Sequence, residues 1–399
     1  MSILRPLFVL CLTLFIVHPA SAEPVDNGLD FNRLIISSGA FTGLPSGSLV
    51  AVAVALERGT RALKLDVTLS LDDQVMVLPD PRLNELTNVA QIYPDRAREN
   101  GAYLSLDFTR DEINNLVYRS SGTAGYGGGS AVFTPQFPVV SLDQVLGYID
   151  TIRPGPGPAD KPIIICELRK GWLHRRDGKD LAGPVYDLLE SFGAQTQMQL
   201  FIASYDPEEL QQLAEKQTVS GRGTDIGFIQ LIGTNDDGEV KNLDFGTYQA
   251  FNYDLLLTNF GLKATTTYAA AIGLQPAAIF NDSAEIVHPA YIENARMLGS
   301  DLILYGEPPS MPFSESPQTS PAATLDRLFT TIGFDAVLTD DAMLINGSKE
   351  PAAKPIDNAA GSSRGIDQLI RQIETGMSDN TPADPELQTE RRGTGDSSF

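Results

Sequence analysis

Oppositely charged residues that could act together stand two apart at two places in the chain. Lys64 and Asp66 lie in the apolar run 62–70, and Glu167 and Arg169 stand at the end of another. Alternate residues of a β-strand point to the same face and are about 7 Å apart along it. If the face of Lys64 is buried, its ammonium is expected to form a salt bridge with Asp66 or Glu167. Removing one partner of a buried pair leaves the other charge uncompensated.

The N-terminus has the composition of an export signal. Arg5 precedes an apolar run over 6–17, and small residues follow as far as Ala22. These features are typical of a secretory signal peptide over residues 1–22. The run is too short to remain as a membrane span, and no second one follows. The mature protein is expected to be exported, to the periplasm or as a secreted protein, with no transmembrane segment.

Histidine and cysteine are scarce in the mature chain. Cleavage would leave two histidines, His174 and His288, and one cysteine, Cys166. A single cysteine forms no internal disulfide, and a zinc site built on histidines is nearly excluded. Loss of Arg5 takes the formal charge from −22 to −23, which repels nucleic acid and anionic membranes. No nucleic-acid partner is expected, and the sequence does not identify a ligand or protein partner.

Short β-branched runs alternate with amphipathic stretches between residues 33 and 346, as in βα units around a parallel sheet. Helical patterns separate most of these runs, for example at 48–58, 179–192, 207–216 and 321–332. An α/β protein with eight such units over about 250–300 residues favours a TIM (β/α)8 barrel, although an open doubly wound sheet also fits the pattern. The predicted strands are residues 33–37, 62–70, 162–168, 199–204, 226–232, 267–272, 301–305 and 334–339.

The region 81–149 breaks this alternation and is interpreted as an insertion over the barrel mouth. It contains an acidic helical piece at 109–118 and a Gly-rich run at 122–130. The Gly-rich run lacks the lysine and the spacing of a phosphate-binding loop. Beyond residue 346 the chain is polar, charged and rich in Gly and Pro, so 347–399 is expected to be a disordered tail.

Four short motifs follow one another in the first part of the chain, at 34–40 (LIISSGA), 44–48 (LPSGS), 63–66 (LKLD) and 77–80 (VLPD). Their order resembles that of the glycerophosphodiester phosphodiesterases, which have a barrel of the phospholipase C-like type. In that family a strand ends in His-Arg-Gly-Ala, a Pro-Glu-Asn-Thr-like turn follows, a second strand carries Glu-x-Asp, and a hairpin carries His-Asp. Further similarity to the periplasmic branch runs from 93–101 (YPDRAREN and Gly101) to 336–340 (AVLTD), so it covers nearly the whole chain up to residue 346.

The resemblance implies hydrolysis of phosphoric diesters with two histidines as acid and base, an arginine on the phosphate and a bound divalent cation. The reactive positions differ in this chain. Ser37 stands at the place of the first histidine, Ser38 at that of the arginine, and Pro79 at that of the second histidine. None of these three side chains can perform the original step.

The metal carboxylates implied by the resemblance would fall at Ser46 or Lys64, at Asp66 and at Glu167. Calcium and magnesium need several oxygen ligands, and an ammonium in the coordination shell repels them. If Lys64 points into the barrel, it takes the place of the ion. No cofactor is therefore expected, whereas an enzyme using non-standard residues would need calcium or magnesium.

Four other residues are candidates for ligand contacts at the barrel mouth. Arg169 could bind an anion or pair with a nearby acid, and His174 could meet a ligand or be a hydrogen-bonded structural histidine. Asp80 lies at a hairpin end, where an acid can also be a helix cap. Counting back from the last strand aligns Tyr305 with a late histidine of the family.

These replacements predict a catalytically inactive relative of the family that acts through ligand or protein binding. The alternative is an active phosphodiesterase for lipid-derived substrates that uses residues such as Asp66, Glu167, Asp80, Arg169 or His174. The predicted domain boundaries are 1–22 for the signal, 33–346 for the barrel and 347–399 for the tail.

Overall fold

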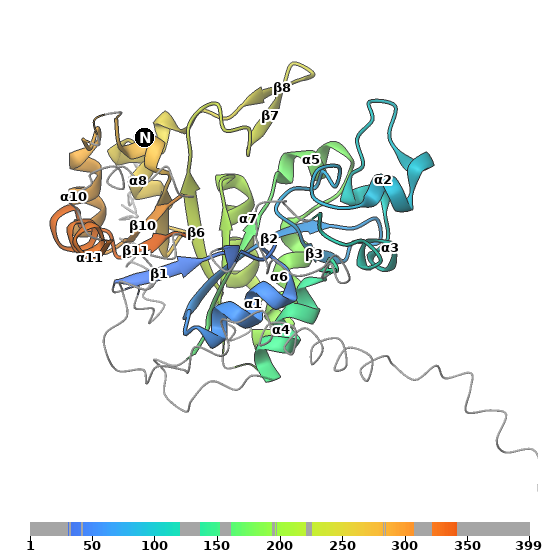
Figure 1. The fold of residues 1–399 in the computed structure, drawn as a ribbon. Helices are drawn as coiled ribbons and strands as arrows, with labels where there is room; N and C mark the ends of the chain where they lie inside the picture. The colour runs from blue at the N-terminus through green and yellow to red at the C-terminus, as the bar shows by residue number, and fades with distance from the viewer. Residues whose placement is uncertain are drawn as a thin grey trace, which may run out of the picture.

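The computed structural model (Figure 1) describes residues 31, 33–40, 43–119, 136–151, 161–193, 196, 198–220, 226–281, 283, 285–306 and 321–340. The predicted signal 1–22, the Gly-rich run 122–130 and the predicted tail 347–399 lie outside these residues. Within them, no helix is long and apolar enough to cross a bilayer.

Eight parallel strands form a closed barrel. Each pairs with the next in the order β1-β11-β10-β9-β6-β5-β4-β2, and β1 also pairs with β2, which closes the ring. The TIM-barrel prediction is confirmed, and the open doubly wound sheet is excluded. The strands are β1 (Leu34–Ser37), β2 (Ala62–Leu69), β4 (Ile163–Leu168), β5 (Gln199–Ser204), β6 (Gly227–Ile232), β9 (Ala271–Leu274), β10 (Asp301–Tyr305) and β11 (Ala336–Leu338).

One strand prediction was displaced along the chain. The strand expected at 267–272 is β9, which begins at Ala271. Thr267 and Tyr268 instead continue the turn that ends α8, because their amides donate to Ala264 and Thr265. The hydroxyl of Thr267 also donates to the carbonyl of Ala264, a local side-chain hydrogen bond of the kind that competes with strand pairing.

Helices cover the outside of the barrel, as Figure 1 shows. In α1 the residues from Leu49 to Ala55 are all buried, and Ser48 caps its start by accepting from the amide of Ala51. Because α4 packs against α1, it belongs to the helical layer, although the insertion was predicted to extend to residue 149. The helices are α1 (Leu49–Glu57), α4 (Leu142–Thr151), α5 (Gly171–Arg176), α6 (Ala182–Gly193), α7 (Pro207–Ser220), α8 (Asn259–Thr265), α9 (Pro276–Ile279), α10 (Pro289–Met297), α11 (Pro321–Asp326) and η6 (Arg327–Ile332), with the short η5 (Tyr253–Leu255).

The insertion after β2 stands beside the barrel (Figure 1). It starts after β3 (Val75–Val77), which pairs antiparallel with β2. A capping box between Thr109 and Glu112 begins the helix predicted in 109–118. Arg98 anchors the insertion by bonding Asp107 and also Asp177, which follows α5. The short helices are α2 (Val89–Ile92), η2 (Pro94–Arg96), η3 (Ser105–Asp107) and α3 (Arg110–Asn114).

A two-stranded hairpin, β7 (Lys241–Asp244) and β8 (Thr247–Ala250), projects beyond the carboxyl ends of the barrel strands (Figure 1). Its turn residues Phe245 and Gly246 both have positive φ angles, 45° and 81°, as a tight hairpin turn requires. Trp172 of α5 holds its base, since its ring lies 5.4 Å from that of Tyr248 and its indole N–H donates to Gly238.

Candidate functional site

The side chain of Lys64 lies inside the barrel mouth between two carboxylates. Its Nζ is 2.9 Å from Oδ1 of Asp66 and 3.2 Å from Oε2 of Glu167. Asp66 of β2 and Glu167 of β4 are direct partners in the register of these strands. All three side chains are at least 93% buried. The salt bridge predicted for Lys64 with one of these acids is therefore present, and it includes both.

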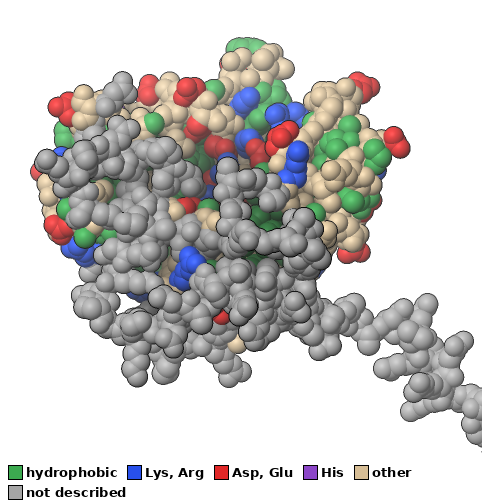
Figure 2. Space-filling model, viewed as in Figure 1, with side chains coloured by type: hydrophobic (Ala, Val, Ile, Leu, Met, Phe, Trp, Pro, Cys, Tyr) green, Lys and Arg blue, Asp and Glu red, His purple; other side chains and the backbone are tan. Residues whose placement is uncertain are grey.

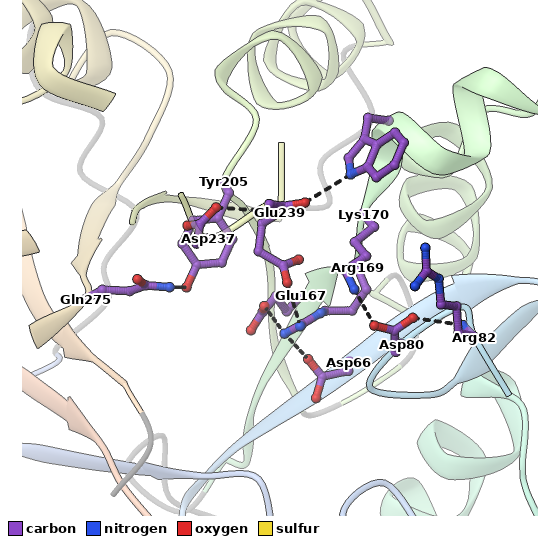
Figure 3. A network of polar contacts seen from close by, with 12 residues as sticks. Asp66, Asp80, Arg82, Glu167, Arg169, Lys170, Tyr205, Asp237, Glu239 and Gln275 are labelled. Carbon is purple, nitrogen blue, oxygen red and sulfur yellow. Dashed lines mark hydrogen bonds and ion pairs between the residues drawn. The ribbon is translucent and has the colours of Figure 1, made fainter. Parts of the chain in front are cut away.

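Arg169 is the second cation of this cluster. Its Nη1 is 2.7 Å from Glu167 and 3.2 Å from Asp66, and its Nη2 is 2.8 Å from Glu239. Of the two possibilities considered for Arg169, it forms the ion pair with nearby acids. Tyr305 completes the cluster, because its hydroxyl donates to Oε2 of Glu167 at 2.7 Å. Figure 3 shows Asp66 of β2, Glu167 and Arg169 at the end of β4, and Glu239 after β6 converging on one another.

The protonation equilibria of the cluster follow its contacts. Burial alone would neutralise Lys64, but Asp66 and Glu167 raise its pKa above the usual value. Burial raises the pKa of Asp66 against the attraction of Lys64 and Arg169. For Glu167 burial is overcome by Lys64 and Arg169, which lower its pKa to about 2. Glu167 is thus an anion held by two cations, with no proton to donate near neutral pH.

Ser37 and Ser38 bind an acid that follows the last strand of the barrel. Asp340, just after β11, accepts from Oγ of Ser37 at 2.6 Å and from the backbone amide of Ser38 at 3.1 Å. The hydroxyl of Ser38 donates to the other carboxylate oxygen of Asp340. Both serines are buried. These contacts join the end of β1 to the segment after β11, beside the pairing of these two strands, and none of the three residues lines the mouth pocket.

Pro79 and Asp80 follow the hairpin strand β3. Pro79 is partly buried and brings no proton-transfer group. Asp80 forms an ion pair with Lys170, which follows β4, and accepts from the backbone amide of Arg82 at 2.8 Å. Asp80 thus links the hairpin to the loop after β4, and it is not among the residues that line the mouth pocket.

His174 is a buried structural residue. Its Nε2 accepts from the amide of Leu69 at 3.1 Å, and its Nδ1 lies 3.2 Å from the carbonyl oxygen of Lys170, so the proton sits on Nδ1. Burial lowers its pKa to about 4, which keeps it neutral. The structure places it outside the lining of the mouth pocket. Of the two possibilities raised for His174, it is the hydrogen-bonded histidine.

A pocket of about 340 Å³ opens at the carboxyl ends of the barrel strands. Lys64, Glu167, Arg169 and Tyr305 had been singled out from the sequence and do line it. Sequence reasoning missed four polar lining residues, which stand on loops after three different strands. They are Tyr205 after β5, Asp237 and Glu239 after β6, and Gln275 after β9. Figure 2 shows basic and acidic side chains gathered in the hollow between the β7–β8 hairpin and the insertion.

The donor set of this cluster does not fit calcium or magnesium. Asp66 and Glu167 are the acids available from β2 and β4, and both already bind Lys64 and Arg169. A divalent cation between Asp66 and Glu167 would lie only a few ångströms from the ammonium of Lys64, and the two positive charges would repel each other strongly. Within the described part of the chain, no group of three or more His, Cys, Asp or Glu residues could hold a metal ion.

A closed parallel barrel with a polar pocket at the carboxyl ends of its strands defines a TIM-barrel protein whose site lies at the usual face. A crystal structure of a putative glycerophosphoryl diester phosphodiesterase from Silicibacter pomeroyi has a similar fold. Its TM-score is 0.51 at 18% identity, and the match covers 79% of this chain and 94% of that one.

Two curated relatives are named glycerophosphodiester phosphodiesterase. The protein from Treponema pallidum is 27% identical over 256 residues, and that from Haemophilus influenzae is 26% identical over 263. The matches cover 62% and 63% of this chain and 71% of each relative. The model of the glycerophosphoryl diester phosphodiesterase family matches residues 38–344. The chain therefore belongs to this family, which supports a glycerophosphodiester phosphodiesterase-like function.

Proposed function

We propose that this protein is a non-catalytic member of the glycerophosphodiester phosphodiesterase family that acts by binding a ligand or a protein at the barrel mouth. The observation that supports this most is the position of Lys64, whose ammonium bonds both Asp66 and Glu167. The two acids that would hold a divalent cation are neutralised by the chain itself. The protein accordingly carries no calcium or magnesium.

Two of the residues suggested as replacements for the acid and base, Glu167 and His174, cannot take these roles. Glu167 stays ionised because its pKa is about 2, and His174 is neutral but has both nitrogens engaged away from the pocket. Each proton-transfer group contributes about 10²–10⁴ in rate, and a metal ion several kcal/mol more. Losing all of them leaves little rate above background, even though such effects are not additive.

Turnover by the purified chain 23–399 tests this proposal. The protein is incubated with glycerophosphocholine and millimolar calcium or magnesium, and released glycerol 3-phosphate is measured. No release above the buffer blank is expected. Release that disappears in Glu167→Gln but persists in Asp244→Asn, an exposed acid of the hairpin, would establish an active phosphodiesterase with non-standard residues.

We also propose that the protein is exported, because Arg5, the apolar run 6–17 and Ala22 have the order of a cleavable signal. Expression of the full chain in a bacterium, followed by N-terminal sequencing of the exported fraction, tests this. A mature N-terminus at Glu23 is expected. A chain that stays in the cytoplasm with Met1 intact would contradict export.

A further inference from the structure

The two cations of the mouth pocket are already paired with acids of the chain. Lys64 contacts Asp66 and Glu167, and Arg169 contacts these two acids and Glu239. A phosphate or carboxylate ligand would have to displace one of these internal partners. Breaking such a buried pair strands a charge, which costs about 3–5 kcal/mol. The pocket is therefore poorly suited to anions.

The loop after β6 adds further negative charge to the same pocket. Asp237 and Glu239 both line it, and Oδ1 of Asp237 accepts from the backbone amide of Glu239 at 3.0 Å. The second oxygens of these carboxylates, Oδ2 of Asp237 and Oε2 of Glu239, have no hydrogen-bond partner among the described residues. Nε of Arg169 is the cluster's one unpartnered buried donor in the described part of the chain, so acceptors exceed donors.

The charges of the pocket show the same excess. Two cations, Lys64 and Arg169, line the pocket together with three carboxylates, and a fourth carboxylate pairs with both cations from outside the lining. These carboxylates are those of Asp66, Glu167, Asp237 and Glu239. Burial raises the pKa of Glu239 to about 7, with Arg169 opposing and Glu167 adding to the rise. A cation placed beside the carboxyl group of Glu239 would lower this pKa and favour the ionised form.

We propose that the mouth pocket binds a small organic cation with N–H donors, a primary ammonium or a guanidinium. This inference rests on the proposed function, since it requires the internal ion pairs that exclude a metal and a phosphoric diester. An N–H cation supplies both the charge and the donors that Asp237 and Glu239 lack. Tyr205 and Gln275, bonded to each other at 2.8 Å, and Tyr305 form the uncharged walls. The volume of about 340 Å³ lies within the range of small-ligand sites.

Calorimetric titration of the chain 23–399 at pH 8 tests the inference. The probes are putrescine and agmatine as N–H cations, tetramethylammonium as a cation without N–H donors, and inorganic phosphate and glycerol 3-phosphate as anions. Saturable binding is expected for putrescine or agmatine, with tetramethylammonium at least about tenfold weaker because charged hydrogen bonds contribute about 1.5–3 kcal/mol. No binding of either N–H cation, or equal binding of tetramethylammonium or an anion, would overturn the inference.

Glu239→Gln and Asp244→Asn form a matched pair of variants, because each removes one negative charge from the same loop and hairpin region. Glu239→Gln is expected to weaken binding of the N–H cation about tenfold or more, and Asp244→Asn to leave it unchanged. If Glu239→Gln does not fold, Asp237→Asn takes its place with the same expectation. Equal affinity in the wild type and the folded pocket variant would refute the assignment. Release of glycerol 3-phosphate in the separate assay with glycerophosphocholine would count against the proposed function. Failure to bind an N–H cation would count against this inference alone, so the two failures are distinguishable.

Discussion

Replacing Lys64 with methionine removes the ammonium from the cluster while keeping a side chain of similar length. Asp66 and Glu167 would then share Arg169 as their remaining cation in this cluster, at 3.2 and 2.7 Å. Loss of one partner from a buried pair costs about 3–5 kcal/mol. Because Arg169 still compensates part of the charge, the free energy of unfolding of Lys64→Met is expected to fall by about 3 kcal/mol, at the lower end of this range.

Urea unfolding at pH 7, followed by circular dichroism, measures this loss. Lys216→Met is the matched control, since Lys216 pairs with Asp187 in a bridge whose side chains are 41% and 62% exposed. An exposed pair contributes at most about 1 kcal/mol. The reasoning would be refuted if Lys64→Met lay within about 1 kcal/mol of the wild type, or if both variants lost the same stability.

The pH dependence of this difference has a definite sign. Lys64 and Arg169 hold the pKa of Glu167 at about 2, below the value of 4.5 for an ordinary glutamate. A group whose pKa is lowered by folding stabilises the protein above its unfolded pKa, and this contribution is lost as the pH falls toward the folded one. The gap between the wild type and Lys64→Met is therefore expected to be full above pH 4.5 and to narrow below it.

Three further substitutions test other parts of the structure. His174→Leu should cost about 1–3 kcal/mol at pH 7, because the amide of Leu69 loses its acceptor. Since burial lowers the pKa of His174 to about 4 from 6.5, this difference in the free energy of unfolding should shrink as the pH falls from 6.5 toward 4. Gly171→Ala should lower the melting temperature, because the added Cβ would lie 1.8 Å from Oε1 of the buried Glu209. Gly147→Ala is the control: Gly147 lies within α4, an added Cβ would meet no atom within 4 Å, and the melting temperature should rise slightly. An unchanged melting temperature in Gly171→Ala, or a pH-independent effect of His174→Leu, would contradict these contacts.

The strands were predictable because their signal is local. Apolar runs such as 162–168 and 199–204 predicted strands within a residue or two of β4 and β5. The Lys64 salt bridge was also accessible, since Lys64 and Asp66 share a strand face and a parallel neighbour carries Glu167. Alternation fixes which side chains share a face without knowledge of the whole fold.

The rest of the pocket could not be predicted in this way. Tyr205, Asp237 and Gln275 stand on loops after β5, β6 and β9, and they meet only because the barrel closes. Nothing in the local sequence distinguishes these polar loop residues from solvated ones. The β7–β8 hairpin was also missed. Gly246 in its turn is a weak sequence indication of a hairpin, but two antiparallel strands in succession do not follow the alternation of strands and helices used to find the barrel.

Calcium binding to the purified chain tests the central claim, which is that the Lys64 ammonium takes the place of a divalent ion. Titration of calcium into chelator-treated protein is followed by calorimetry and by the melting temperature. The account predicts no saturable binding up to millimolar calcium and an unchanged melting temperature in the wild type, with calcium-dependent stabilisation appearing in Lys64→Glu, where three carboxylates would meet. One calcium ion bound per wild-type chain, and lost in Glu167→Gln, would contradict it.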